Sequence, residues 1–288
     1  MFVGAVPRPA VAQITRTVPF AAWREVFVGC SGSSRFDRAV KDVHPSVRVH
    51  SNDVSLLSCS LGAAATSTEF PIAFTGRLAF IEEALAGRPF KARVAAVEVA
   101  LEMAKYTGRN TYAQIHFAHY QSRFGDFLAP ALARLEVFLE HLDISSFHAG
   151  DFRQQARRAV GVGGGVAFPP TYKNGYKRLY RFVDDNTEWD RPGYEVWEPA
   201  RIEDWLDELD AMRVHYCVLT DHTLERHEPA TVYRNNTNKP VFTIADHAAS
   251  SVRRGSHQSD PFRYVPTDPA ALAPQDRPWR SWPPPPGR

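Results

Sequence analysis

Short apolar runs separated by glycine-rich or polar turns dominate the first part of the chain. Val26, Phe27 and Val28 lead into Gly29-Cys30-Ser31-Gly32-Ser33, and a helical pattern follows over residues 35–40. Residues 46–53 then alternate between apolar and polar, as a half-buried strand does. The pattern predicts a strand, a tight glycine turn, a helix and a second strand, which is how an α/β domain begins.

From residue 78 to about residue 142 the spacing becomes that of helices. Apolar residues recur every three or four positions in two sets, namely Val94, Val97 and Leu101, then Leu128, Leu132, Leu135 and Leu139. Such spacing places them on one helix face. We therefore predict a helical subdomain, residues 78–145, inserted between a first part of the α/β domain, residues 1–77, and a second part, residues 146–249.

The second part returns to mixed patterns. We predict helices over 153–159 and 200–212, a short buried strand before Pro169-Pro170, a loop over 194–199, a strand over 215–220, and a β-hairpin over 230–244 with Asn235-Asn236-Thr237-Asn238 as its turn. An antiparallel pair of this kind belongs at the edge of a mostly parallel sheet. The fold class is accordingly an α/β sheet with an inserted helical subdomain and a terminal hairpin.

Both ends of the chain have a different character. The first 22 residues contain three prolines and short apolar pieces, and we expect them to lie across the surface before the first strand. Residues 250–288 are rich in proline, arginine and glycine and end in Trp282 followed by four prolines. Such a composition predicts a disordered tail.

The composition is that of a globular protein. Apolar residues make up 44% of the 288 residues, enough to fill a large core, and a net charge of +2 does not select a partner. Cys30, Cys59 and Cys217 are far apart and form no CxxC pair, so neither a zinc site nor a disulfide framework is expected. The chain has no apolar run of about 18 residues, and its start lacks the pattern of a signal peptide. We expect a cytoplasmic protein that does not enter a membrane.

The glycine turn is the first candidate binding site. A turn of this kind between a strand and a helix lets a ligand approach the backbone, although ordinary turns look the same. Asp53 ends the second strand about 20 residues beyond Gly29, where nucleoside-binding folds place a carboxylate that binds ribose hydroxyls. Asp53 could equally cap the helix that follows. The pairing of the two features favours a cofactor site.

Two further segments carry candidate chemistry. The apolar run that ends at Pro169-Pro170 marks a strand end, where open α/β sheets place their sites. Within the helical block lies a mixture of basic and aromatic side chains: Lys105, Tyr106, Arg109, Asn110, Tyr112, His116, His119, Tyr120 and Arg123. These suit phosphates and unstacked bases, but they also suit the solvated face of an amphipathic helix. His116 and His119 have no carboxylate or thiol partner nearby, so no metal site is expected.

Several other chemistries do not fit the residues. Ser33 replaces the last glycine of a Gly-x-Ser-x-Gly nucleophile turn built on Ser31. No Gly-Lys-Ser/Thr follows the glycines, which excludes a P-loop. Neither Cys59 nor Cys217 has the proline-cysteine loop expected of a pyrimidine-ring methyltransferase.

The order of these features resembles that of DNA adenine methyltransferases that use S-adenosylmethionine, and in particular a phage-type group of antirestriction adenine methyltransferases. The resembling positions are Val28, Gly29, Cys30, Ser31, Gly32 and Ser33, then Asp53, the helical block, Asp151-Phe152, and Phe168-Pro169-Pro170-Thr171-Tyr172. The resemblance covers residues 24–245. It implies a Rossmann-like methyltransferase sheet, S-adenosylmethionine as cofactor and DNA as partner.

The resemblance also assigns roles. The glycine turn would hold the methionine end of the cofactor, Asp53 its ribose and Asp151-Phe152 its adenine, while the helical block would recognise the target. The segment of Phe168, Pro169, Pro170 and Tyr172 stands where the family has its catalytic Asp-Pro-Pro-Tyr.

The catalytic segment departs from the family pattern. The family's acid or amide before Pro-Pro accepts a hydrogen bond from the target amine, and its aromatic residue stacks on the flipped base. Phe168 cannot accept that bond, and Thr171 has no ring, although Tyr172 follows it. Two hypotheses remain: an adenine methyltransferase that protects phage or plasmid DNA from restriction, with Asp221 or His222 contributing to the reaction, or a catalytically silent protein that binds DNA or a restriction component.

Overall fold

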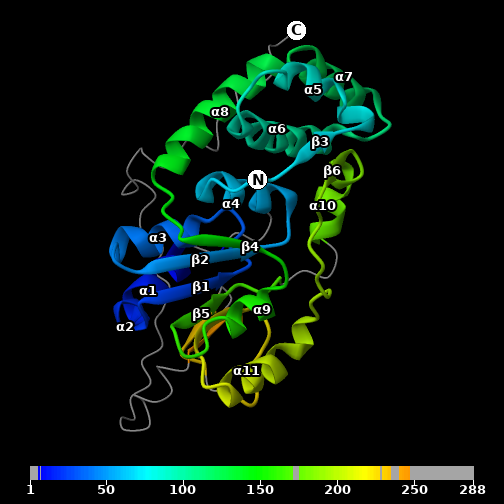
Figure 1. Ribbon diagram of the computed structural model, residues 1–288. Coiled ribbons are helices and arrows are strands. Elements are labelled where there is room, and N and C mark those ends of the chain that lie inside the picture. Colours follow the sequence, from blue (N-terminus) through cyan, green and yellow to red (C-terminus); the bar gives the residue numbers. More distant parts are fainter. Residues whose placement is uncertain (1–5, 7, 171–174, 228, 235–239, 247–288) are drawn as a thin grey trace, which may run out of the picture.

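The computed structural model describes residues 6, 8–170, 175–227, 229–234 and 240–246 (Figure 1). Thr171, Tyr172, the predicted hairpin turn and the predicted disordered tail lie outside these residues. Within them, the chain forms a layered α/β structure, and a group of helices lies beyond one face of the sheet (Figure 1).

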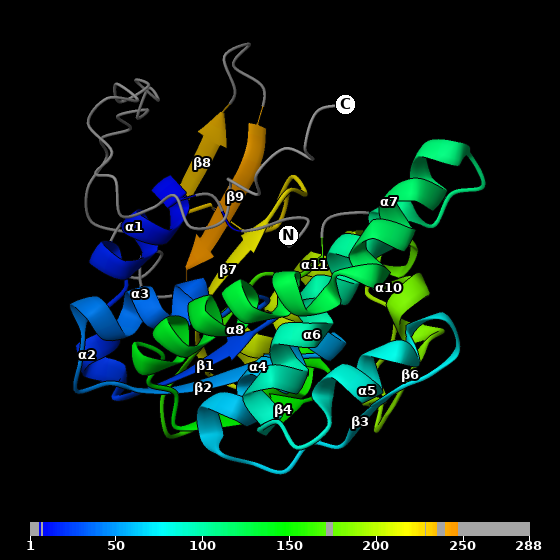
Figure 2. The ribbon, with the colours of Figure 1, turned by 90° about the horizontal axis from the view of Figure 1, so that it is seen from above.

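In the described ranges the main sheet has seven strands in the order β4-β2-β1-β5-β7-β9-β8. They are β1 (Glu25–Gly29), β2 (Arg48–Asp53), β4 (Ser146–Ala149), β5 (Gly164–Ala167), β7 (His215–Thr220), β8 (Thr231–Arg234) and β9 (Pro240–Asp246). The strands from β4 to β7 run parallel, whereas β9 is antiparallel to both of its neighbours. The Rossmann-like α/β sheet and its terminal hairpin are therefore confirmed. Figure 2 shows the hairpin at the edge opposite β4.

Helices cover both faces of this sheet. Helices α3 (Arg35–Val43) and α4 (Leu56–Thr66) lie on one face, and α9 (Phe152–Arg157) and α11 (Ile202–Ala211) lie on the other (Figure 1). Alternate residues of β1 serve the two layers: Val26 and Val28 join the core under α3 and α4, and Phe27 joins the core under α9 and α11. This two-residue alternation is the geometry of a strand buried on both faces.

The predicted helical subdomain is present between β2 and β4. It contains η1 (Gly76–Leu78), α5 (Phe80–Leu85), α6 (Phe90–Met103), η2 (Ala104–Tyr106), α7 (Thr111–Ser122) and α8 (Phe124–Glu140). Helix α6 is its centre, because most of its residues are buried, and α8 runs along it (Figure 2).

A later part of the chain joins this subdomain, which periodicity did not indicate. After β5, α10 (Gly175–Asp184) packs against α6, and β6 (Thr187–Trp189) pairs antiparallel with β3 (Ile72–Phe74). The Arg77 guanidinium lies 4.2 Å from the ring centre of Phe117, and the ring of Phe182 lies 5.8 Å from that same ring. The subdomain therefore takes in residues 175–189 as well as the predicted insert.

The expectation for the first 22 residues was wrong. Residues 8–17 form α1 (Arg8–Thr17) and residues 20–23 form α2 (Phe20–Trp23), with Ile14 and Phe20 almost fully enclosed. Proline is tolerated in the first turn of a helix, since the N–H groups there have no intrahelical partner. Pro9 occupies such a position in α1, and Pro19 directly precedes α2, so these two prolines are compatible with helices that belong to the core.

Candidate functional site

The order of the strands fixes where a ligand can approach. The chain leaves β1 toward β2 and β4 on one side, and β5 and β7 lie on the other. Open α/β sheets bind ligands at this reversal, outside the carboxyl ends of the strands. Gly29 ends β1 there, and its carbonyl oxygen accepts a hydrogen bond of 3.2 Å from the Phe168 N–H, just beyond β5. Two predicted site segments, 28–33 and 168–170, therefore meet.

The glycine turn has a strained, compact backbone. After the buried Val28, Cys30 and Gly32 adopt φ values of 58° and 56°, in the left-handed region. A Cβ atom on Gly29 would lie 2.9 Å from the Cβ atom of Phe152, so that glycine is needed for packing against α9. Ser33 lies in the turn and is partly exposed.

Hydrogen bonds fasten the turn to the end of β2. The Ser31 N–H and hydroxyl both donate to the Asn52 carbonyl, at 2.9 and 3.0 Å. The Gly32 N–H donates to Asp53 Oδ2 at 2.8 Å, and Asp53 Oδ1 accepts from the N–H groups of Val54 and Ser55. Ser55, not Asp53, caps α4, because its side chain accepts from the Ser58 N–H. Asp53 remains partly exposed at the sheet edge.

A second carboxyl group, which sequence reasoning missed, lies behind the turn. Asp37, in the first turn of α3, is fully buried and accepts a hydrogen bond from the Ser51 hydroxyl of β2. Burial raises the pKa of Asp37 to about 7, although the bond from Ser51 opposes the shift. No sequence signal identified it, since acids are common in first helical turns for helix-dipole reasons alone.

Asp151 and Phe152 follow β4 on the neighbouring strand end. Asp151 caps α9 by accepting from the Arg153 N–H, and it also binds the Arg153 Nε at 2.9 Å. Burial alone would raise the pKa of Asp151, but Arg153 holds it below the usual range. The ring of Phe152 packs edge-on against Trp197 and Trp205, at centroid distances of 5.1 and 5.0 Å. Asp151 thus lies at the predicted site, while the ring of Phe152 belongs to the core beneath it.

An irregular segment, residues 190–198, passes over this turn, and only residues 194–199 were predicted as a loop. We call it the crossing segment. The Glu195 N–H donates to Asp151 Oδ2 at 3.4 Å, and the Glu195 carboxylate binds Arg153 at 2.7 Å. Its aromatic residues Tyr194 and Trp197, between Pro192 and Pro199, were the available signal, but contacts across more than 40 positions cannot be derived from local patterns.

Negative charge gathers at the glycine turn. Burial, and then the carboxylates of Asp53 and Asp151, raise the pKa of the Cys30 thiol well above its usual value. The thiol is therefore protonated at neutral pH, which makes Cys30 a poor nucleophile. A cation is better suited to this place than an anion.

The first residues after β5 pack against the protein core. Phe168 packs edge-on against Phe36 of α3, with ring centres 4.9 Å apart. Pro169 is buried and Pro170 is exposed, whereas Tyr172 lies outside the described residues. Asp221 and His222 follow β7, which pairs directly with β5, so they end at the same edge of the sheet.

The basic and aromatic residues of the helical subdomain form a connected group around α7. The ring of Tyr106 stacks on His116 at 4.9 Å, and His119 packs edge-on against Phe127. Tyr112 and Ile115 are exposed, with 64% and 62% of their surface open. Residues 103–125 contain no acid, although Glu102 and Asp126 at either end pair with Lys105 and Arg123. The basic side chains of this surface suit a polyanion.

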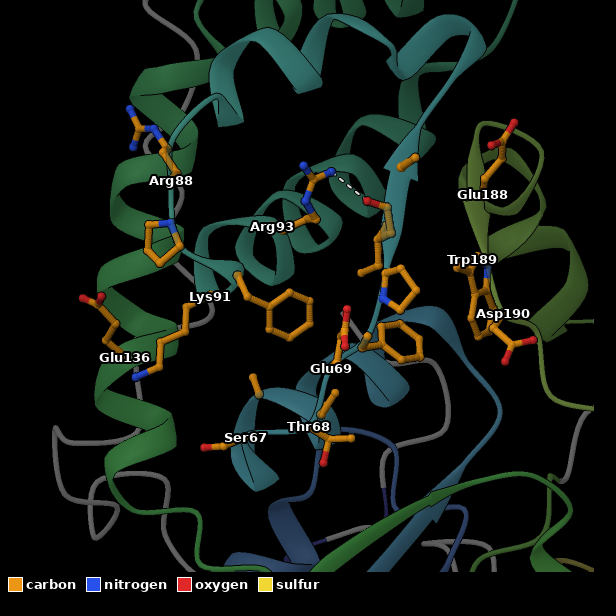
Figure 3. Close-up of a pocket in the computed structure, with 18 residues that line it drawn as sticks. Ser67, Thr68, Glu69, Arg88, Lys91, Arg93, Glu136, Glu188, Trp189 and Asp190 are labelled. Atoms are coloured by element: carbon orange, nitrogen blue, oxygen red, sulfur yellow. Dashed lines mark hydrogen bonds between the residues drawn. The ribbon is translucent and has the colours of Figure 1, made fainter.

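A large cleft lies elsewhere, between β3, β6 and the helices α4, α6 and α8 (Figure 3). Its volume is about 1260 Å³, and Phe70, Phe90 and Trp189 supply much of its apolar wall. Its charged lining is mixed: Arg88, Lys91 and Arg93 against Glu69, Glu136, Glu188 and Asp190. Arg93 already donates to the Ile72 carbonyl (Figure 3), and it also binds Glu82. This balance does not suit a phosphate backbone.

In the part of the chain that the structure describes, no group of three or more His, Cys, Asp and Glu side chains could hold a metal ion. Among those same residues, every helix is too short or too polar to cross a membrane.

Comparison with known proteins gives one family match. The model of the family described as phage DNA adenine methylase-like domain 1 matches residues 2–266, and none of the curated proteins matches the chain. The matched residues include the whole sheet and the helical subdomain. This chain therefore belongs to the phage DNA adenine methylase-like family and is a DNA methyltransferase-like protein.

Proposed function

We propose that the protein is an S-adenosylmethionine-dependent DNA methyltransferase that acts on an adenine amino group. The observation that carries the proposal is the convergence of Gly29–Ser33, Asp53 and Asp151 at the reversal point of the sheet, in a chain of this family. In this assignment the glycine turn holds the methionine end, Asp53 the ribose and the Asp151-Phe152 turn the adenine.

The charge of the site supports this cofactor over a phosphate-bearing one. Asp37, Asp53 and Asp151 surround the turn, and the Ser31 and Gly32 N–H groups already donate to protein oxygens. A dinucleotide pyrophosphate would find neither free donors on these two residues nor a favourable charge. S-adenosylmethionine has no phosphate, and it supplies a methyl group activated by a sulfonium cation. Carboxylates nearby stabilise that cation and the ammonium group of the methionine part.

The buried Asn52 side chain also supports a ligand with hydroxyl groups at this site. Its amide nitrogen donates to the carbonyls of His148 and Gly150, and its Oδ1 has no donor among the described residues. A buried acceptor without a partner costs stability, and an ordered water or a ligand hydroxyl would satisfy it. Asn52 directly precedes Asp53, the proposed ribose-binding residue.

The reaction would rest mainly on alignment of the target amine with the methyl group. Pro169 and Pro170 shape the wall beside Gly29, and we assign stacking on the flipped base to Tyr172, which lies outside the described residues. Phe168 has no acceptor for the amine. Asp221 follows β7, the strand that pairs with β5 through Ala167 and Val218, and is our candidate acceptor.

We assign DNA contact to the basic surface around α7, which offers Arg109 to phosphates and the exposed Tyr112 to bases. Lys105 and Arg123 belong to this surface and exchange their present partners, Glu102 and Asp126, for phosphates. The boundaries of the target-recognition subdomain, 78–145 with 175–189, are part of this proposal. A modified adenine would protect phage or plasmid DNA against cytoplasmic restriction enzymes, which is the biological role that we propose.

The test is methyl transfer from labelled S-adenosylmethionine to unmodified DNA. We expect label in adenine with the wild type, and a loss of at least tenfold in incorporation with Asp53→Asn, which keeps the size of the side chain but removes its charge. Asp42→Asn, an exposed acid of α3, is the matched control and should retain full activity. Absence of both cofactor binding and incorporation in the wild type would contradict the proposal.

One observation favours a second function, a catalytically silent protein that binds DNA or a restriction component. Phe168 is packed against Phe36 and hydrogen-bonded to Gly29, so it occupies the position of the family's acid as a structural residue. In that case the protein binds cofactor and DNA but transfers no label to any DNA. Phe168→Asp separates the two functions further, because it restores the acceptor and should create activity only in a silent protein.

A further inference from the structure

The crossing segment is fastened directly over the turn that follows β4. The Glu195 carboxylate accepts hydrogen bonds from Arg153 at 2.7 Å and from Arg201 at 3.2 Å. The Glu195 N–H donates to Asp151. Two residues later, Trp197 lies against Phe152. These contacts fix the position of residues 195–197 relative to the turn that follows β4.

Tyr194 immediately precedes this fastened part. Of its surface 43% is open, so its ring is accessible to a ligand. Burial, and then the carboxylates of Asp184 and Asp53, raise the pKa of the Tyr194 phenol. The Glu195 N–H, one residue later, donates to Asp151 Oδ2 at 3.4 Å, which places the Tyr194 backbone beside the turn that follows β4.

Phe152, which the family resemblance suggests for contact with the adenine, cannot present its ring to a ligand. Phe152 is only 7% exposed, and Trp197 and Trp205 pack edge-on against its ring. Its Cβ atom lies directly under Gly29. A purine at this edge of the sheet needs another flat apolar surface.

We propose that Tyr194 is that surface, a positioning residue that stacks on the purine ring of the nucleoside whose ribose Asp53 binds. This inference rests on the proposed function, because it takes the cofactor site as given. It adds a residue from a segment that carries none of the family motifs. A tyrosine ring stacks without hydrogen-bond readout, so Asp53 and the turn supply the specificity and Tyr194 supplies affinity.

The experiment measures binding of S-adenosylhomocysteine and of free adenosine by calorimetry. We expect Tyr194→Phe to bind both within about twofold of the wild type and Tyr194→Ala to bind both about tenfold more weakly, which is the usual effect of losing one stacking partner. Tyr194→Leu keeps apolar bulk without an aromatic face and should fall between them. Val196→Ala, at a more exposed position of the crossing segment (58%), is the control and should bind like the wild type.

The two ligands make the readout specific. A contact to the purine lowers affinity for both by the same factor, whereas a general loosening of the segment also lowers the thermal unfolding midpoint. Wild-type affinity in Tyr194→Ala overturns this inference and leaves the proposed function intact. A wild type that binds neither ligand overturns the proposed function, and this inference with it.

Discussion

Asp37 lies fully enclosed behind the glycine turn, with Ser51 as its hydrogen-bond donor and Asp53 nearby. Burying a carboxyl group is costly in its charged form, and a neighbouring like charge adds to the cost. Residues that cost stability in this way are concentrated at functional sites. Asp37 is well placed to strengthen the negative field that a cationic cofactor meets, since any bound cation lowers its pKa in return.

Asp37 makes stability depend on pH in a defined direction. Its folded pKa of about 7 lies above the ordinary value of 3.8, so the folded state holds the proton to higher pH than the unfolded chain. The stabilisation is complete below pH 4 and is lost as the pH rises toward 7. Asp37→Asn should therefore gain stability over the wild type between pH 4 and pH 7, by about 1.4 kcal/mol for each unit of pKa difference, and keep that gain above pH 7.

Chemical unfolding at pH 4, 5.5, 7 and 8 measures this difference. Asp42→Asn, on the exposed face of the same helix, should show a difference from the wild type that hardly changes with pH. A flat difference for Asp37→Asn as well would show that Asp37 titrates normally.

At the residue scale, the sequence predicted positions better than roles. Gly29, Asp53 and Pro169 could be predicted because each ends or closely follows a strand of one parallel sheet, and such ends share an edge. Asp151 was indicated by the family resemblance alone. The burial of Phe152 and Asp37 could not, since it depends on helices packed above them from other parts of the chain.

Among the elements, the contact of α4 with β4 shows how closely a covering helix packs on the sheet. A Cβ atom on Gly62 would lie 2.1 Å from ring atoms of Phe147. Glycine inside a helix normally costs about 0.5–1 kcal/mol relative to alanine. Here the missing side chain lets the aromatic ring lie against the helix backbone.

Gly62→Ala should therefore destabilise the protein, by about 1–3 kcal/mol of overpacking, in spite of the better helix propensity of alanine. Denaturant unfolding gives the free energy. Gly125→Ala, in α8 with no atom within 4 Å of the added group, should be neutral or stabilising by up to about 1 kcal/mol. The double change Gly62→Ala with Phe147→Leu should recover part of the loss, and a stable single variant would contradict this account of the contact.

Elements with regular apolar spacing could be predicted from the sequence, and those held by distant partners could not. The strand His215–Thr220 and the helices α6 and α8 follow their patterns. Strands β3 and β6 have only three residues each and pair across more than 100 positions of chain. Helix α1 was hidden by prolines, although it contributes Ile14 to the core.

For the whole molecule, the net charge of +2 conceals an uneven distribution. The glycine turn is surrounded by carboxylates, the cleft of Figure 3 is mixed, and residues 103–125 are basic and free of acids. Each phosphate contact made by Lys or Arg releases counterions, which makes binding to DNA weaker as salt rises. This distribution is what we expect if cofactor and nucleic acid bind to different surfaces, as we propose.

The salt dependence of DNA binding tests this assignment. Arg109→Ala should lower the slope of log K against log salt by about 1, and replacing Lys105, Arg109 and Arg123 together should lower it by about 2 to 3. Lys91→Ala, in the mixed cleft, should leave the slope unchanged and serves as the control. Fluorescence anisotropy at several salt concentrations gives the slopes, and equal effects of Arg109→Ala and Lys91→Ala would exclude α7 as the DNA surface.

The position of the insert between neighbouring strands also sets an order of folding. His50 and Ser146 pair directly across β2 and β4 although 96 residues separate them, and β1 meets β5 across an even longer stretch. Closing such long loops is slow, because chain entropy must be lost before any contact forms. Helices α6 and α8 rely on local contacts and can form early, which brings the two strands closer before they pair. The subdomain to which we assign target recognition would then also promote the pairing of β2 with β4 during folding.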